Sequence, residues 1–304
     1  MGKKNREKRR GDSHRQRKRL IGGIIALIAA AVYILIYHRP APNYDISQNA
    51  AGSLKVHFLD VGQADCILIQ SDGKNMLIDA GNNNDKEYVI SYLREQGVTR
   101  LDYAIGTHAH EDHIGSMDDV ILNFEIGELF LPDQTYETQS YTDVLIAAEN
   151  RELHVTHPKF KETRYLGEAR FIFVMPDADR EYTDINDSSL GIRISNGKHS
   201  FLLCGDSSKA MEEEFLDSRI YLHSDVFKVS HHGSSDANST AFLKAVDPEY
   251  AVISCGKNND YGHPHKRTLK RLKKTGAKLF RTDQQGTIIF ESDGNILTCN
   301  TNAL

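Results

Sequence analysis

The stretch THAHEDH, residues 107–113, decides both the fold and the chemistry to be expected of this chain. Its metal-binding side chains are His108, His110, Asp112 and His113. In an extended segment His108 and His110 would point the same way, because side-chain direction repeats every two residues. Asp112 and His113 would then open a helix. The motif therefore predicts that one pair of ligands holds one divalent ion and the next pair holds another.

The segments around this motif alternate short apolar runs with single helices. A strand is expected directly before the motif, at LDYAIGT (101–107), and a helix directly after it, from about 114 to 122. Further strands are expected at 54–60, 65–71, 75–80, 125–132, 169–176, 188–195, 198–205, 226–230, 249–255, 278–281, 286–291 and 295–300. Further helices are expected at 86–97, 141–150, 211–217 and 265–276, and up to about 245. This order indicates an α/β sandwich, with sheets inside and helices outside.

The pattern HxHxDH after a strand resembles the signature of the metallo-β-lactamase superfamily. That resemblance implies a four-layer αββα sandwich with two divalent metal ions, Zn²⁺ or Mn²⁺. It implies that the four motif residues are ligands and that Asp206, in LLCGD, bridges the two ions. Asp79, in LIDAG, would support the metal-binding loop without ligating.

Five further segments narrow the resemblance to one family. They are HFLDVGQADCILIQ (57–70), NDSSL (186–190), CGD (204–206), KVSHHGSS (228–235) and YGHPH (261–265). Together, over about residues 54–300, they resemble the C-terminal hydrolase domain of the ComEC competence protein. Bacterial phosphorylcholine esterases share a similar core, which widens the range of substrates to be considered.

The segment KVSHHGS offers one more ligand. One of His231 and His232 is expected to bind the second metal, with His231 favoured, and the other to contact substrate. Gly233 and Ser234 could offer backbone N–H groups to a phosphate. His263, in GHPH, could donate a proton to the leaving group.

The third histidine that usually completes the first metal site has no obvious counterpart. Asn186 and Asp187 fall near its position in the sequence, and Asn186 and Ser189 are expected to lie beside the substrate. A ligand-poor site would bind more weakly or favour a harder ion such as Mn²⁺.

The N-terminus predicts an uncleaved membrane anchor, and a cleaved signal peptide is the alternative. Residues 1–19 carry ten Lys or Arg and two acids, and residues 20–37 (LIGGIIALIAAAVYILIY) carry no charge. Eighteen such residues span about 27 Å as a helix, close to the apolar thickness of a bilayer. The expected organisation is a cytoplasmic tail (1–19), a single transmembrane helix (20–37), a linker (38–52) and an extracellular hydrolase domain (53–304).

The charge outside the tail limits the choice of partners. Without Arg39 and the charged residues of the tail, 26 basic and 40 acidic residues remain, a net charge of −14. A protein that coats nucleic acid uniformly would be basic. The run from Lys266 to Arg281, which holds eight Lys or Arg and no acid, predicts a local phosphate track that includes Lys270. A solvated helix face is the alternative.

The expected function is a phosphodiesterase or nuclease that uses a metal-activated water outside the membrane. Asp79, Asp112 and His263 are the expected catalytic residues. The alternatives are hydrolysis of a small ester, such as a choline-phosphate decoration, a lactone or a thioester, and a tethered scaffold without turnover. A phosphoester such as DNA and the membrane are the expected partners, and no motif points to a protein partner.

Overall fold

The computed structural model describes residues 52–175 and 182–304. The predicted tail (1–19), the predicted membrane helix (20–37) and the linker up to residue 51 lie outside these residues. Within the two described ranges, no helix is long and apolar enough to cross a membrane.

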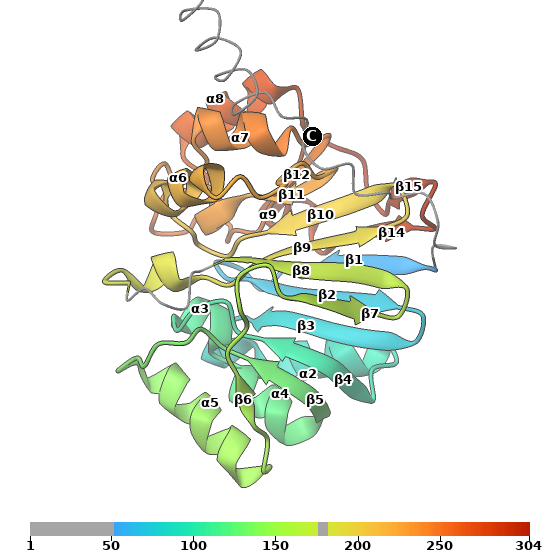
Figure 1. The fold of residues 1–304 in the computed structure, drawn as a ribbon, viewed down its shortest axis with the longest axis vertical. Helices are drawn as coiled ribbons and strands as arrows, with labels where there is room; N and C mark the ends of the chain where they lie inside the picture. Colours follow the sequence, from blue (N-terminus) through green and yellow to red (C-terminus); the bar gives the residue numbers. More distant parts are fainter. Residues whose placement is uncertain (1–51, 176–181) are drawn as a thin grey trace, which may run out of the picture. The chain divides into compact units, whose positions relative to one another are not determined.

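The first sheet has eight strands in the described part of the chain, in the order β15-β14-β1-β2-β3-β4-β5-β6 (Figure 1). They are β1 (Leu54–Phe58), β2 (Cys66–Ser71), β3 (Lys74–Ala80), β4 (Arg100–Ile105), β5 (Glu125–Phe130), β6 (Val155–Thr156), β14 (Ile288–Ser292) and β15 (Leu297–Cys299). From β15 to β3 the neighbours are antiparallel, and from β3 to β6 they are parallel.

The second sheet has seven strands among the described residues, in the order β13-β12-β11-β10-β9-β8-β7. They are β7 (Thr163–Leu166), β8 (Ala169–Met175), β9 (Gly191–Asn196), β10 (His199–Leu203), β11 (Val226–Lys228), β12 (Tyr250–Ile253) and β13 (Lys278–Arg281). From β10 to β13 the neighbours are parallel, which requires a crossover after each strand.

Helices provide these crossovers and cover the outer faces of both sheets (Figure 1). On the first sheet they are α2 (Lys86–Glu95), α3 (Glu111–Ile114), α4 (Met117–Asn123) and α5 (Gln139–Asn150). On the second sheet they are α6 (Lys209–Asp217), α7 (Thr240–Val246) and α8 (Lys266–Thr275). Shorter turns are η1 (Asn83–Asp85), η2 (Ile185–Ser188), η3 (Ser230–Gly233) and α9 (Thr282–Gln285).

Three buried clusters hold the four layers together. Between the sheets, Val56 and Phe58 of β1 pack with residues of the second sheet such as Phe201. Leu68 and Leu77 face the other way, towards the helices of the first sheet. The outer face of the second sheet packs in the same manner against α6, α7 and α8. Strand side chains alternate between the two faces of a sheet, and because both faces are covered here, the side chains on both are apolar. The predicted αββα sandwich is confirmed.

One predicted helix is divided in two. The segment expected from 114 to 122 is α3, a turn at Gly115 and Ser116, and then α4. A Cβ atom on Gly115 would lie 2.4 Å from the backbone nitrogen of Asn83, so only glycine fits at this close approach. The break ends α3 at Ile114, one residue after His113, so Asp112 and His113 lie on a short helix while His108 and His110 lie in the loop before it.

The parallel strands place the candidate residues at one end of the sandwich. The motif follows β4, Asp206 follows β10, His231 and His232 follow β11, and His263 follows β12. The carboxyl ends of parallel strands in open α/β sheets are where ligands usually bind.

Candidate metal centre

Asp79 anchors the loop that carries the motif. Its buried carboxylate accepts hydrogen bonds from the N–H of Thr107 at 2.7 Å and from the Thr107 hydroxyl at 2.8 Å. It also contacts Nδ1 of His113 at 2.8 Å. These three contacts fix the start of the loop and the orientation of the His113 ring, which is the supporting role expected for Asp79.

Four side chains converge beside this anchor. Asp112, His113, Asp206 and His232 each offer one ligand atom, and these atoms all lie within 4.8 Å of one another. Nε2 of His113 is 3.3 Å from Oδ1 of Asp206. Nε2 of His232 is 3.3 Å from Oδ2 of Asp112 and 3.6 Å from Oδ2 of Asp206.

The donor set fits a divalent cation. Nε2 of His113, Nε2 of His232 and Oδ1 of Asp206 are buried and have no hydrogen-bond partner. The opposite ring nitrogens are already occupied: Nδ1 of His113 faces Asp79, and Nδ1 of His232 lies 3.1 Å from the carbonyl oxygen of Ser254. Buried polar atoms without partners are costly, and imidazole with carboxylate suits zinc and related ions.

The electrostatics of these groups also fit a bound cation. Burial would lower the pKa of His113, yet the carboxylates of Asp206 and Asp79 raise it well above its ordinary value. Burial would raise the pKa of Asp206, yet His232 and His113 hold it well below its ordinary value. The carboxylates therefore keep protons on the rings, and a metal ion would take the place of those protons.

The first half of the motif has fewer donors. Nε2 of His108 lies 3.1 Å from Nδ1 of His110, so the two nitrogens could share one ion. Nδ1 of His108 lies 3.1 Å from the hydroxyl of Thr107 and 3.3 Å from the hydroxyl of Ser189, which also accepts a hydrogen bond from the N–H of Asp206. Among the described residues, no group of three or more His, Cys, Asp or Glu ligands includes His108 or His110.

The residues near the expected third histidine lie in η2. The carboxylate of Asp187 accepts a hydrogen bond from the N–H of Ser208 at 3.3 Å, so it is occupied in this conformation. Oδ1 of Asn186 is buried without a partner. Ser189 therefore touches the candidate centre directly, whereas Asn186 has no contact with the converging ligands in the described interactions.

The histidine pair has the reverse arrangement to the one that the sequence favoured. His232 is buried and joins the ligand group, whereas the side chain of His231 is 26% exposed, with its Nε2 3.6 Å from Oδ2 of Asp206. Both residues adopt a left-handed backbone, with φ of 52° and 49°. This conformation is rare for residues with a Cβ, and it turns the two neighbouring rings to different positions.

Gly233 and Ser234 are the two residues whose backbone N–H groups the sequence predicts to bind phosphate. The N–H of Ser234 donates to the carbonyl oxygen of His231 at 2.7 Å, so the expectation that this N–H is free for a phosphate is corrected. Gly233 has φ of 86° and lies under Pro264, where a Cβ atom would be 2.6 Å from Cβ of the proline. Glycine is needed at this position to bring the two loops together.

His263 lies at the edge of the group, 5.7 Å from His231 and 6.3 Å from His232 between ring centroids. The side-chain oxygen of Gln63 accepts the N–H of Gly256, so its nitrogen donates to Nδ1 of His263 at 3.2 Å. Burial and the neighbouring His232 and His231 lower the pKa of His263 to about 4. At neutral pH the ring is therefore uncharged and carries its proton on Nε2.

A buried ion pair beneath the centre was missed from the sequence. Nζ of Lys228 contacts Oδ2 of Asp65 at 2.7 Å, and both side chains are 1% exposed. Oδ1 of Asp65 lies 3.6 Å from Nδ1 of His232. The available signal was Lys228 itself, because a lysine at the end of an apolar strand must be paired if it is buried.

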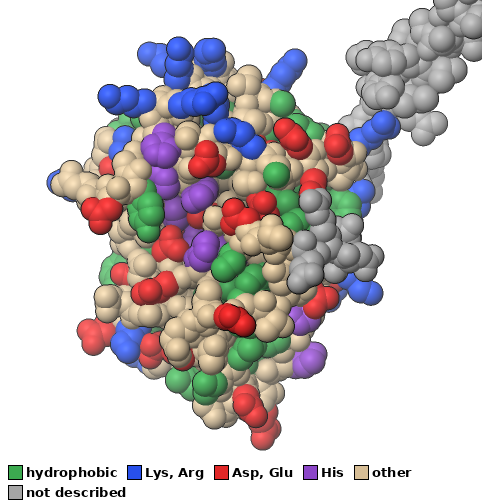
Figure 2. All heavy atoms as spheres, turned by 90° about the vertical axis from the view of Figure 1, so that its left-hand side faces the viewer, with side chains coloured by type: hydrophobic (Ala, Val, Ile, Leu, Met, Phe, Trp, Pro, Cys, Tyr) green, Lys and Arg blue, Asp and Glu red, His purple; other side chains and the backbone are tan. Residues whose placement is uncertain are grey.

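The surface around the centre has a distinct pattern of charge. Figure 2 shows histidine side chains gathered in a hollow, with Lys and Arg side chains above them. The helix α8, which follows His263, carries the exposed basic residues Lys266, Arg267, Lys270, Lys273 and Lys274. Lys270 thus lies on this helix and not among the converging ligands.

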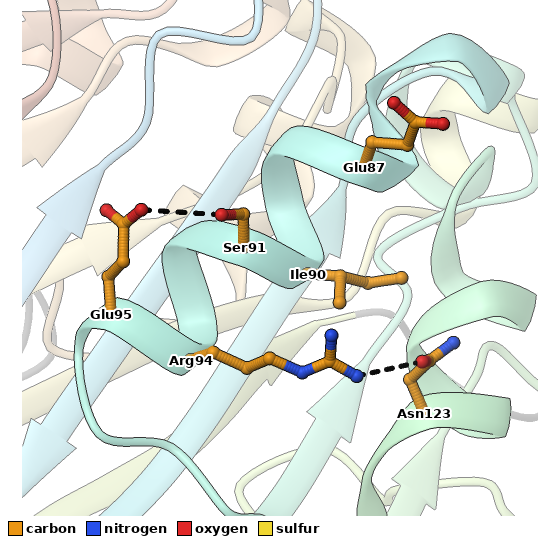
Figure 3. Close-up of a pocket in the computed structure, with 6 residues that line it drawn as sticks. All are labelled: Glu87, Ile90, Ser91, Arg94, Glu95 and Asn123. Carbon is orange, nitrogen blue, oxygen red and sulfur yellow. Dashed lines mark hydrogen bonds between the residues drawn. The ribbon is translucent and has the colours of Figure 1, made fainter.

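A separate pocket of about 580 Å³ lies on α2 and α4 (Figure 3). Arg94 bonds to Asn123 across it at 3.1 Å, and Ser91 bonds to Glu95 at 3.3 Å. Four of its five polar side chains thus bond to one another in pairs, and none of the lining residues belongs to the ligand group described above.

Comparison with known proteins agrees with this geometry. The family model of the metallo-beta-lactamase superfamily matches residues 59–257. ComE operon protein 3 of Bacillus subtilis is 29% identical over 262 residues, which are 80% of this chain and 34% of that protein. Competence protein ComA of Neisseria gonorrhoeae is 30% identical over 243 residues, 76% of this chain and 31% of that protein. The resemblance to the ComEC family is thus confirmed, and the chain spans about a third of the length of these curated relatives.

Solved structures show the same fold at low sequence identity. The metallo-beta-lactamase fold protein YhfI of Bacillus subtilis has a TM-score of 0.53 at 13% identity, covering 79% of this chain and 100% of that chain. Igni18, a metallo hydrolase of Ignicoccus hospitalis, has a TM-score of 0.52 at 15% identity, covering 78% and 98%. With the matched family model, the converging ligands and the two-sheet sandwich, the chain belongs to the metallo-β-lactamase superfamily.

Proposed function

We propose that this chain is a two-metal hydrolase that cleaves phosphodiester bonds. One observation carries the proposal: buried nitrogens of His113 and His232 and a buried oxygen of Asp206 converge without partners. The proposed ligands are Asp112, His113 and His232 for one ion, His108 and His110 for the other, and Asp206 shared between them. When bound, such ions make hydroxide available from water near neutral pH and neutralise charge that develops on the substrate.

The chain's own residues would hold and orient the reacting groups. Asp79 keeps Nε2 of His113 directed at the centre, and the carbonyl oxygen of Ser254 does the same for His232. His263 presents an Nε2–H donor at the edge, where it can bond to a phosphate oxygen or to the leaving oxygen. His231, which is partly exposed and near Asp206, is placed to contact the substrate.

The proposed substrate is a nucleic acid backbone, and helix α8 supports this choice. Five of its basic side chains are exposed, and none of them forms an ion pair in the described part of the chain. Five unpaired cations beside the centre would attract successive phosphates, although the chain outside the tail is acidic. The relative from Neisseria gonorrhoeae is named a competence protein, and a relative from Haemophilus influenzae is named recombination protein 2, which also favours DNA.

The location that we propose is the outer face of the cytoplasmic membrane. The uncharged run 20–37 behind a basic tail supports a single-pass anchor, with the N-terminus in the cytoplasm and the catalytic unit outside. Protease treatment of intact protoplasts tests the orientation. Digestion of the catalytic unit from outside would support it, and full protection would contradict it.

A second candidate is hydrolysis of a small ester. The net charge of −14 outside the tail favours a small or cationic substrate over a polyanion. The two candidates differ in whether the substrate contacts α8. A nucleic acid strand would extend along that helix, whereas a small ester at the centre would not.

The proposal is tested with the full chain, purified in detergent and stripped of metal. Turnover is then measured before and after a metal ion is added back. We expect Mn²⁺ or Zn²⁺ to restore cleavage of bis-p-nitrophenyl phosphate and of single-stranded DNA. Asp206→Asn should lower both rates by more than about 100-fold, because the shared ligand is lost. Asp217→Asn, at an exposed carboxylate that ends α6, is the matched control. A folded Asp206→Asn protein with undiminished turnover would rule out the two-metal arrangement, and cleavage of the small diester alone would favour the second candidate.

A further inference from the structure

Tyr261 is an exposed aromatic residue beside the candidate centre. The residue is 68% exposed, the largest value among the exposed large hydrophobic residues that the structure describes. Single exposed apolar residues are common, so exposure alone indicates no function. The position of the Tyr261 ring relative to the histidines of the site is the informative observation.

Three rings form a column from the centre to the surface. The ring of Tyr261 stacks on that of His263, with centroids 5.6 Å apart and an angle of 21° between the planes. The ring of His263 in turn stacks on that of His232, at 6.3 Å and 27°. Because His232 is buried in the ligand group, the column joins that group directly to the exposed tyrosine.

Polar contacts hold the loop of Tyr261 in place. The side chain of Asn259 accepts the N–H of His263 at 2.9 Å and donates to the His263 carbonyl oxygen at 2.7 Å. Nδ1 of His265 accepts the N–H of Ser235 at 2.8 Å, so its Nε2 carries the proton and donates to the Tyr261 carbonyl oxygen at 3.1 Å. The backbone of Tyr261 is thus fixed without help from its ring, which is presented ready for a ligand.

The chemistry of the surroundings selects the kind of ligand. One face of the Tyr261 ring lies against His263, so the exposure belongs mainly to the opposite face and the ring edge. An open aromatic face can bind a planar base by stacking or a quaternary ammonium group by cation–π attraction. The exposed cations of α8, whose first residue is Lys266, repel an ammonium group and attract phosphates.

We propose that Tyr261 is a stacking platform for one nucleobase of a single-stranded nucleic acid whose neighbouring phosphate occupies the metal centre. The strand must be single, because a base inside a duplex has both faces covered by its neighbours. The proposal rests on the proposed phosphodiesterase function, and it names the part of the substrate that the platform recognises. The backbone phosphates would continue along α8.

Binding measurements on the full chain in detergent test the platform. The probes are a fluorescein-labelled oligothymidylate of twelve nucleotides and an abasic oligomer of the same length and charge, titrated with Ca²⁺ in place of Mn²⁺ or Zn²⁺ so that the centre can hold a cation without cleavage. We expect the wild type to prefer the oligothymidylate. Tyr261→Ala should weaken that binding by about 5-fold to 100-fold and leave the abasic oligomer unaffected. Tyr261→Phe, which keeps the ring, should stay within about twofold of the wild type.

The control is Tyr165→Ala, at another exposed tyrosine, which lies in β7 away from the ligand group. The platform would be overturned if Tyr261→Ala bound both oligomers equally more weakly, or bound both as tightly as the wild type does. It would also be overturned if the wild type bound both oligomers alike or bound neither. If Tyr261→Ala bound oligothymidylate normally but lost turnover of a choline phosphoester, the platform would be overturned in favour of an ammonium ligand. Metal-dependent cleavage of the abasic oligomer reports separately on the proposed phosphodiesterase, so the two proposals can fail independently.

Discussion

At the scale of single residues, the buried ion pair of Lys228 and Asp65 lies directly behind the proposed ligand His232. The pair is removed from water, and Oδ1 of Asp65 faces Nδ1 of His232 at 3.6 Å. The distance is too long for a hydrogen bond, so Asp65 acts on the ring through its charge. Lys228 balances that charge and so permits an ionised carboxylate under the metal centre.

Lys228→Met should therefore destabilise the fold by about 3–5 kcal/mol, because it leaves Asp65 buried without a counter-charge. Adding Asp65→Asn should restore most of this free energy of unfolding, since the unpaired charge is gone. Urea unfolding of the four members of this double-mutant cycle measures the coupling. If Lys228→Met lowers the free energy of unfolding by less than about 1 kcal/mol, Asp65 is not held as a buried charge.

At the scale of elements, α8 combines a structural face with a charged one. Leu272 is buried against the second sheet, and the hydroxyl of Thr268 donates to the carbonyl oxygen of Ser234 at 2.8 Å. Arg271 donates to the carbonyl oxygens of Ala237 and Asn238 at 2.8 and 3.1 Å. The remaining basic side chains are exposed and have no structural bond of this kind in the described residues. Changing them should alter binding and leave the fold intact.

Lys270→Glu with Lys274→Glu should weaken single-stranded DNA cleavage while bis-p-nitrophenyl phosphate is cleaved as before. If both cations contact phosphates, the slope of log affinity against log salt should become shallower by about 1.4, since each contact contributes about 0.7. Lys159→Glu with Lys198→Glu makes the same change in net charge at exposed positions outside α8 and should have little effect. Equal losses on both substrates, or an unchanged salt slope, would argue against a phosphate track on α8.

At the scale of the whole catalytic unit, the candidate centre joins the two sheets. Asp112 and His113 follow β4 of the first sheet, whereas Asp206 and His232 follow β10 and β11 of the second. A bound ion would therefore link the halves of the sandwich at one end. The carboxylates that face His113 and His232 raise the pKa of both rings, so a bound ion would compete with protons at these positions.

Metal should raise the melting temperature of the protein for this reason. At a free concentration of about 100 times the dissociation constant, binding adds about 2.7 kcal/mol, which corresponds to a shift of several degrees for a unit of this size. Differential scanning fluorimetry with and without Mn²⁺ or Zn²⁺, and after chelator, measures the shift. In Asp206→Asn the shift should shrink or vanish, and an equal shift in that variant would place the ion elsewhere.

The sequence by itself determined the fold class and most of the candidate ligands. THAHEDH lies within seven residues, so its chemistry is visible without tertiary information, and the alternation of strands and helices indicated the sandwich. Local patterns also located Asp79 and Asp206 through their short motifs. The division between α3 and α4 was missed, because it depends on the approach of Asn83 to Gly115.

Only the tertiary structure decided the contacts between distant residues. Lys228 and Asp65 are 163 positions apart, and Gln63 and His263 are 200 apart, so no local spacing could join them. The choice between His231 and His232 depended on two left-handed backbone turns, and neighbouring histidines look equivalent in a sequence. The physical reason is common to all three cases: sequence pattern reports local geometry and composition, whereas burial, charge pairing and ring orientation are set by which loops the packed sheets bring together.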